Sequence, residues 1–292
     1  MKQIALKIDV DTYQGTRSGV PALSELLRRH DAKATFFFSL GPDHAGREPK
    51  SGSLKRYYDL RTRLHGRALP GPDIGTRCQD ILRETATAGF ETGIHAWDRA
   101  LWEQRILGGD NNLAETEIDK ACKCFSEIFQ TSAQAHAAAG WRTNRHALRL
   151  TQRRGFSYAS DCRGSHPFRP VIDGELIDCP QIPTTLPTLD ELLALEPGFS
   201  ADQAIDRIFK LSTAIPGDHV FTLRAELEGM AFINAFETLL ARWKDSGVQL
   251  LALGDVRSSL DVAKLPRHSV EQGEIPGRPG LRMIQGERFL EA

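Results

Sequence analysis

Strand-like apolar segments alternate with helix-like segments along the chain, and this alternation restricts the fold more than any other feature. The strand-like runs are 3–9, 35–39, 90–96, 133–139, 158–160, 220–223 and 248–253, with a weaker one at 176–179. Helical spacing of apolar residues occupies 20–27, 73–88, 112–130, 144–153, 201–214 and 231–245. Six or seven such units without an internal repeat predict an α/β fold with a parallel sheet.

A parallel sheet of this size is either doubly wound or closed into a barrel. A doubly wound dinucleotide-binding sheet carries a glycine-rich loop directly after its first strand, whereas Gly15 and Gly19 lie too far along the chain. We therefore expect one (β/α) barrel over residues 1–263, with a polar insertion at about 43–72 and a C-terminal tail, 264–292, packed on the surface. The active site of a barrel lies at the C-terminal ends of its strands.

Charge, hydropathy and cysteine content exclude several classes of protein. The net charge of −1 argues against nucleic acid as a partner. No segment approaches the ~18 apolar residues of a membrane span, and the first residues lack the regions of a signal peptide. Five cysteines without paired CxxC spacing argue against a disulfide framework. These observations predict a cytoplasmic protein.

Polar side chains gather where the predicted strands end. Asp9 and Asp11 close the first strand, and residues two apart on a strand point to the same face. Two carboxylates on one face repel each other unless a cation or a shared proton relieves them. The strand at 90–96 likewise ends in polar residues, His95 and Asp98. Further polar groups follow at 139–142, 160–164 and 223–226.

Seven segments carry a resemblance to a known family. They are IDVDTYQGTRSGVP, FFSLGPDHAGR, ETGIHAWD, AAAGWR, SDCRGSHPFRP, QIPTTLPT and AELEG, in this order over most of residues 4–230. With them the chain resembles the polysaccharide deacetylase family, and within it the enzymes that deformylate 4-deoxy-4-formamido-L-arabinose on undecaprenyl phosphate. The resemblance implies a distorted (β/α)7 barrel that hydrolyses an N-acyl amino sugar carried on a lipid phosphate.

The resemblance also implies roles for individual positions. The first aspartate of the opening motif, Asp9, would be the general base. Asp11, His95 and the residue at position 99 would bind a divalent metal, which is zinc, cobalt or manganese. The residue at position 224 would protonate the leaving amine. An amide needs this help, because a metal polarises its carbonyl group and acidifies water, while an acid must protonate the expelled amine.

The chain departs from the family at two of these positions, which are Arg99 and Arg224. Arginine has no lone pair for a metal and stays charged at any working pH. Asp11 and His95 remain as an incomplete ligand set, with Asp98 as a candidate third, whereas a catalytic zinc normally has three protein ligands. We expect ordered metal to be absent or poorly coordinated.

Three interpretations of the two arginines follow. In the first, the enzyme keeps its activity with a rearranged metal site. In the second, Arg99 and Arg224 pair with Asp9 and Asp11 and stabilise an oxyanion without metal. In the third, the barrel is a catalytically impaired relative that binds the glycolipid. An amide hydrolase is the interpretation that we favour.

Other strand-end residues are candidates for supporting roles. Arg142 is predicted to form a salt bridge with Asp9 and orient it, in the place where the family keeps an arginine. Asp161 and Arg163 are predicted to form an ion pair that orients the site.

Several residues are candidates for contact with the substrate. Trp97, Trp141 and Phe168 could stack on the sugar, although large aromatic residues more often belong to the core. Glu226 could pair with Arg224 or contact substrate, since both are predicted on one strand face.

The insertion is rich in arginine between residues 46 and 67, with apolar residues among the charges. Such a segment usually forms a solvated face. In a relative of an enzyme that acts on a lipid phosphate, it could also contact the anionic inner leaflet of the membrane.

Overall fold

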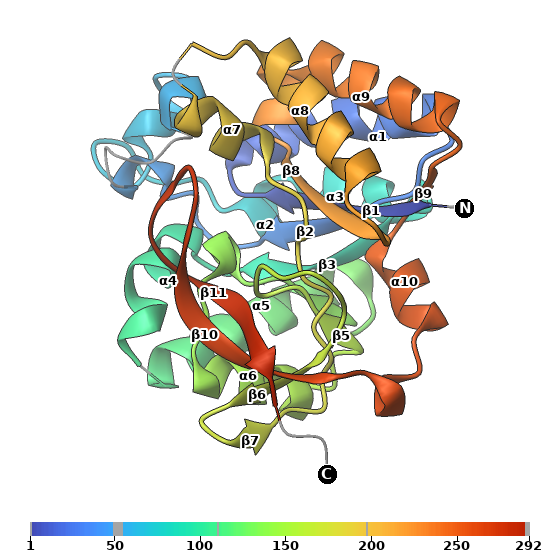
Figure 1. Ribbon diagram of the computed structural model, residues 1–292. Helices are drawn as coiled ribbons and strands as arrows, with labels where there is room; N and C mark the ends of the chain where they lie inside the picture. The colour runs from blue at the N-terminus through green and yellow to red at the C-terminus, as the bar shows by residue number, and fades with distance from the viewer. Residues whose placement is uncertain (1, 49–54, 110, 197, 290–292) are drawn as a thin grey trace.

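A curled parallel sheet forms the centre of the molecule, with helices outside it (Figure 1). The computed structural model describes residues 2–48, 55–109, 111–196 and 198–289. The strands of this sheet are β1 Gln3–Val10, β2 Thr35–Ser39, β3 Glu91–Ala96, β4 Ala135–His136, β5 Tyr158–Ala159, β8 His219–Arg224 and β9 Gln249–Leu251. Their order is β5-β4-β3-β2-β1-β8, and β9 also pairs with β1. This mixed α/β arrangement confirms the predicted fold class.

The helices follow the order expected from the sequence. They are α1 Val20–Arg29, α2 Ile74–Arg77, α3 Gln79–Thr87, α4 Arg99–Arg105, α5 Asn111–Phe129, α6 Arg145–Arg153, α7 Leu189–Leu195, α8 Ala201–Ala214, α9 Ile233–Asp245 and α10 Leu253–Ser259. Asp73 caps α2 by accepting a hydrogen bond from the Thr76 amide at 2.8 Å. No helix in the described ranges has the length and apolar character needed to cross a membrane.

The sheet is a half-barrel whose two edges are joined by a single segment, residues 180–186. On one side, the Ile182 amide donates to the Ala159 carbonyl of β5 at 2.8 Å. On the other side, the Thr185 amide donates to the Val220 carbonyl of β8 at 3.1 Å. The distortion of the barrel therefore lies between β5 and β8, where a connecting segment replaces a regular strand.

Strand β1 shows how the sequence divides the core. Its residues Ile4, Leu6 and Ile8 are fully buried against the outer helices. The alternate residues point into the barrel, because side chains of a strand alternate between its faces. Lys7 and Asp9 on this inner face are also buried, so two charged groups lie inside the barrel, towards the C-terminal end of β1.

The C-terminal segment forms a hairpin that the sequence analysis did not anticipate. Its strands β10 Arg267–Ile275 and β11 Arg278–Arg288 join β6 Arg169–Ile172 and β7 Glu175–Leu176 in the order β11-β10-β6-β7. Arg278 anchors the hairpin to the start of α7, where its Nη2 and Nε lie 2.7 Å from Asp190 and 3.0 Å from Glu191. The hairpin crosses the front of the barrel in Figure 1.

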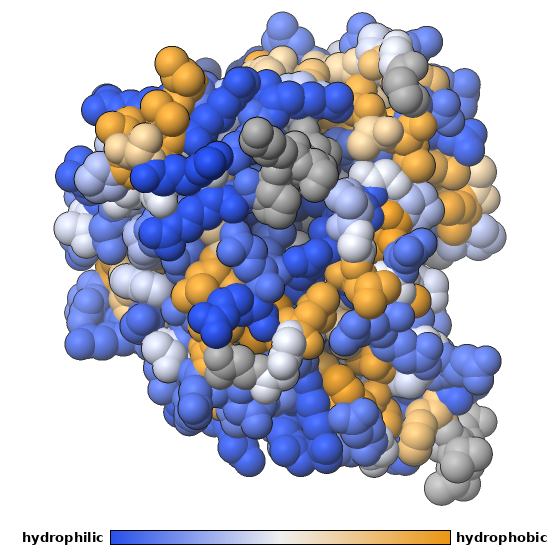
Figure 2. Space-filling model, turned by 90° about the vertical axis from the view of Figure 1, so that its left-hand side faces the viewer, coloured by the Kyte–Doolittle hydropathy of each residue, from blue (hydrophilic) through white to orange (hydrophobic). Residues whose placement is uncertain are grey.

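The described residues of the insertion at 43–72 contain short helical turns at Ala45–Arg47, Lys55–Tyr57 and Thr62–Leu64. A hydrogen bond of 2.9 Å between His65 Nδ1 and the Asp43 carboxylate joins the later part of the insertion to its first residue. The face of the molecule in Figure 2 is mainly hydrophilic, with separate hydrophobic patches.

Candidate active site

Five side chains predicted from the sequence meet at the C-terminal ends of β1, β3 and β8. Asp9 and Arg224 are register partners on the neighbouring strands β1 and β8. Asp11 follows β1, His95 lies at the end of β3, and Arg99 begins α4. All five are at most 5% exposed. These five side chains therefore lie together, at one end of the barrel.

Asp11 is the centre of this group. Its Oδ1 lies 3.1 Å from His95 Nε2 and 3.5 Å from Arg99 Nε, and its Oδ2 accepts a hydrogen bond from Arg224 Nη1. Burial raises the pKa of Asp11, but the two arginines and His95 together outweigh burial and hold it below its usual range. Asp11 is therefore an anion with three positively charged or chargeable neighbours.

Two further carboxylates lie against the positive charge of Arg99. Its Nη1 donates to Glu103 at 2.6 Å, and its Nη2 contacts Glu48. Burial lowers the pKa of Arg99, yet Asp11 and Glu103 outweigh it, and the pKa is raised. The sequence analysis missed Glu48 and Glu103, because one lies in the insertion and the other on the helix after Arg99.

Asp9 has a different neighbour from the one predicted. The expected salt bridge with Arg142 is wrong; Lys7 Nζ lies 3.5 Å from Asp9 Oδ1, because the two residues share the inner face of β1. Arg142 instead donates to the backbone carbonyl of Glu103. His95 Nδ1 is 3.8 Å from Asp9 Oδ1, and this oxygen accepts no hydrogen bond.

Asp161 and Arg163 do not form the predicted ion pair. Asp161 accepts hydrogen bonds from His136 Nδ1 and the Ala138 amide, both at 2.8 Å. Arg163 pairs with Glu191 at 2.8 Å. Strand β5 ends before Asp161, so residues two apart no longer share a face. His136, which had no distinctive spacing in the sequence, is the actual partner.

Trp141 does not present its ring to a sugar. It is 1% exposed, and the guanidinium carbons of Arg163 and Arg278 lie 5.0 and 4.8 Å from the ring centroid. These cations occupy the aromatic faces that stacking would need. Phe168 is fully buried in the core, whereas Trp97 is half-buried beside Gly41.

Glu226 is not the partner of Arg224. Its Oε1 accepts hydrogen bonds from the Asp11 and Thr12 amides at 2.9 and 2.8 Å. The Arg224 amide donates to Glu228 at 2.8 Å. Because β8 ends at Arg224 and the chain turns, the expected alternation does not continue. Burial, helped by Asp11, raises the pKa of Glu226 to about 7, and burial raises that of Glu228 to about 8.

The side chains at this site do not fit a divalent metal. Asp11 and His95 offer two ligand atoms, and Arg99 places a guanidinium where a third ligand would lie. Asp98 is engaged elsewhere, since it caps α4 and lies 2.6 Å from His44 Nδ1. Within the described ranges, no three His, Cys, Asp or Glu side chains are grouped to hold a metal ion. Two ligand atoms are fewer than a stable metal site needs. The positive charges of the two neighbouring arginines also repel a cation.

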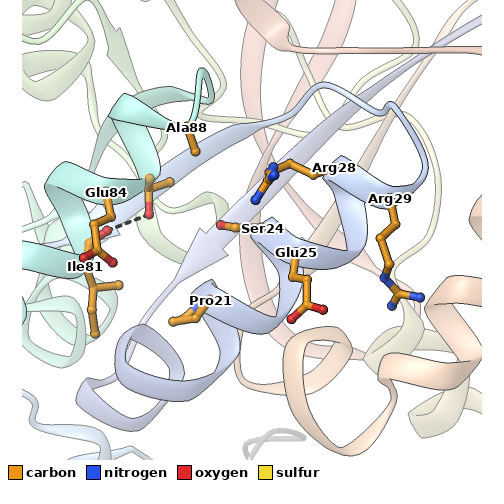
Figure 3. A pocket seen from close by; sticks show the side chains of 9 residues that line it. Pro21, Ser24, Glu25, Arg28, Arg29, Ile81, Glu84 and Ala88 are labelled. Carbon is orange, nitrogen blue, oxygen red and sulfur yellow. Dashed lines mark hydrogen bonds between the residues drawn. The ribbon is translucent and has the colours of Figure 1, made fainter.

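One surface hollow of about 700 Å³ lies away from this site. Residues of α1 and α3 line it, among them Pro21, Ser24, Arg28 and Glu84 (Figure 3). It contains none of the five strand-end side chains, and it faces outward from the layer of helices. We assign it no part in the chemistry.

Comparison with known proteins agrees with the fold. The family model of polysaccharide deacetylases matches residues 1–159. A protein of Shewanella sediminis, named as a 4-deoxy-4-formamido-L-arabinose-phosphoundecaprenol deformylase, is 35% identical over 95% of this chain and 93% of its own length.

Two solved structures share the fold at low sequence identity. A protein described as a polysaccharide deacetylase, from Mycobacterium smegmatis, has a TM-score of 0.66 and 18% identity, covering 94% of both chains. A family 4 acetyl xylan esterase from Clostridium thermocellum, solved in complex with a cobalt ion, has a TM-score of 0.52 and 12% identity, covering 88% of this chain and 91% of its own. A bound metal thus occurs among proteins of this fold. On the family match and the 35% identity, the chain belongs to the polysaccharide deacetylase family.

Proposed function

We propose that this protein deacylates an N-formyl or N-acetyl amino sugar carried on a lipid phosphate, without a bound divalent metal. The observation that carries the proposal is the buried group of Asp9, Asp11 and His95 at the strand ends. The 35% identity to a deformylase of a phosphoundecaprenol-linked formamido sugar supports the substrate class.

In this proposal Asp9 is the general base. Its Oδ1 lies 3.5 Å from Lys7 Nζ but accepts no hydrogen bond, so it has a lone pair available for a proton from the attacking water. Arg99 and Arg224 supply fixed positive charge for the oxyanion that forms on the amide carbonyl. Neither arginine releases a proton at working pH. Asp9 therefore returns its proton to the amine as the C–N bond breaks, which leaves a carboxylic acid and a free amino sugar.

A second candidate function is binding of the same glycolipid without hydrolysis. The ion pairs of Asp11 favour it, because both arginines that would stabilise an oxyanion are already neutralised by carboxylates. Fixed guanidinium groups also acidify water far less than a metal does.

Formate release from a lipid-linked formamido sugar separates the two functions. We expect release that a chelator does not reduce, and a loss of about 100-fold or more in Asp9→Asn, which removes the base. Asp245→Asn, at the exposed end of α9, is the matched control and should keep full activity. Release abolished by the chelator would contradict the proposal. No release, together with retained glycolipid affinity, would favour the binding function.

We also propose that the insertion contacts the membrane that carries such a substrate. Leu60 is 73% exposed, and the exposed Arg61 and Arg63 follow it in the chain. Basic side chains near an anionic leaflet contribute about 1 kcal/mol each. Neutralising Arg56, Arg61 and Arg63 together should abolish co-sedimentation with vesicles that contain anionic lipid. Unchanged sedimentation would rule out this contact.

A further inference from the structure

Two arginines, Arg142 and Arg282, converge beside Gly280 without a carboxylate partner. A Cβ atom built on Gly280 would lie 3.0 Å from Arg142 Nη2 and 3.6 Å from Arg282 Nη1. Arg142 follows the turn after β4, and Arg282 lies on β11, so the fold brings the two together from distant parts of the chain. Within the described ranges, neither guanidinium forms an ion pair.

The hydrogen bonding of this pair is incomplete. Arg282 is 5% exposed, and its Nη1 donates to the Leu281 carbonyl at 2.8 Å. The Nε atoms of Arg142 and Arg282 are both buried without a hydrogen-bond partner. Buried donors are rarely left unpaired, since each costs about 1–3 kcal/mol. Burial and the neighbouring Arg142 lower the pKa of Arg282 to about 10, as expected where like charges stand together.

The adjacent arginines behave differently. Arg278 pairs with Asp190 and Glu191, and Arg163 pairs with Glu191. Their charges are balanced by carboxylates in direct contact. Within the described ranges Arg142 and Arg282 have no such contact, and the charge of the nearby Glu103 offsets that of Arg282 only in part.

Glu103 connects this pair to the strand-end site. Its backbone carbonyl accepts from Arg142, while its carboxylate is committed to Arg99 at 2.6 Å. These two guanidinium groups, which have no carboxylate in direct contact, are thus one residue away from the Asp11 cluster. An anion held between them would lie beside the proposed reaction site.

We propose that Arg142 and Arg282 form a binding site for the phosphate group of a phosphate ester. The identity of the ester rests on the proposed function: it is the lipid phosphate that carries the amino sugar. Guanidinium groups suit this task, since each offers paired donors that match two oxyanion oxygens. Gly280 is exposed and has a φ of 81°, so the backbone beside the pair carries no side chain that would fill the space next to the two guanidinium groups.

Calorimetric titration with geranyl phosphate, a short soluble prenyl phosphate, tests the site. We expect Arg282→Gln and Arg142→Gln each to weaken binding by about tenfold or more, and Arg282→Lys, which keeps the charge but loses the paired donors, to weaken it less than Arg282→Gln. Arg267→Gln, at the exposed start of the same hairpin, should leave the affinity unchanged. Equal affinity in wild type and both glutamine variants would overturn the proposal. So would binding of inorganic phosphate without binding of the ester.

Thermal melting distinguishes a binding role from a structural one. If the two guanidinium groups bind an anion and do not stabilise the fold, the melting temperature of Arg282→Gln without ligand should be no lower than that of wild type. Geranyl phosphate should then raise the melting temperature of wild type but not that of Arg282→Gln. A lower melting temperature with the ligand effect intact would overturn the proposal.

The outcome is also separable from that of the proposed function. Lost geranyl phosphate binding in Arg282→Gln would support the phosphate site even if wild type released no formate. Formate release with the same KM in wild type and variant would support the hydrolase and overturn the phosphate site.

Discussion

Replacing both Arg99 and Arg224 by histidine should give a protein that binds one Co²⁺ or Zn²⁺ per chain. In the wild type, Asp11 Oδ1 and His95 Nε2 lie 3.1 Å apart, and neither atom has a hydrogen-bond partner. Two ligand atoms therefore already lie side by side. A histidine at position 99 adds the third ligand, and the loss of both guanidinium groups removes the repulsion. Cobalt absorption spectra and metal analysis after dialysis measure the gain.

Two controls make this result specific. The variant with glutamine at both positions loses the same charges without gaining a ligand, and it should bind metal weakly. Adding Asp11→Asn to the histidine variant should remove the gained site. If the histidine variant and the glutamine variant bind metal equally, the arginines do not occupy the place of a ligand.

Asp11→Asn should destabilise the protein by about 3–5 kcal/mol, because it leaves buried cations without their shared carboxylate. Arg224 loses the only carboxylate that contacts it among the described residues, whereas Arg99 keeps Glu48 and Glu103. The larger part of the loss should therefore come from Arg224. Urea unfolding followed by circular dichroism measures the free energy of unfolding.

A surface ion pair provides the matched control. Asp119 on α5 pairs with Arg154 at 2.5 Å, and both side chains are at least a third exposed. Asp119→Asn should cost at most about 1 kcal/mol, as exposed pairs usually do. An equally small cost for Asp11→Asn would show that the cluster is open to solvent and contributes little to stability. Combining Asp11→Asn with Arg224→Met should recover part of the loss.

The convergence of the site could be predicted because it depends on strand ends alone. Parallel strands place their C-terminal ends at one edge, so Asp9, His95 and Arg224 were placed together by the order of the elements. The partners of these residues could not be predicted in the same way. Glu103 reaches Arg99 along a helix, and Lys7 replaces Arg142 beside Asp9.

The alternation of side chains between the two faces of a strand also gave a wrong prediction where a strand ended sooner than expected. The prediction for Glu226 assumed a strand that extends past Arg224, where β8 ends. The C-terminal hairpin escaped prediction for a related reason. Its strands are half-exposed on both faces and contain several glycines and arginines, so they lack the apolar alternation typical of a strand.

A metal titration of the wild-type protein tests whether Arg99 and Arg224 leave room for a bound metal. We propose that Arg99 and Arg224 take the places of a metal ligand and an acid. Zinc, cobalt and manganese should then show no saturable binding that depends on Asp11 or His95. One equivalent of any of these metals, retained by wild type after dialysis and lost in Asp11→Asn or His95→Gln, would contradict the account.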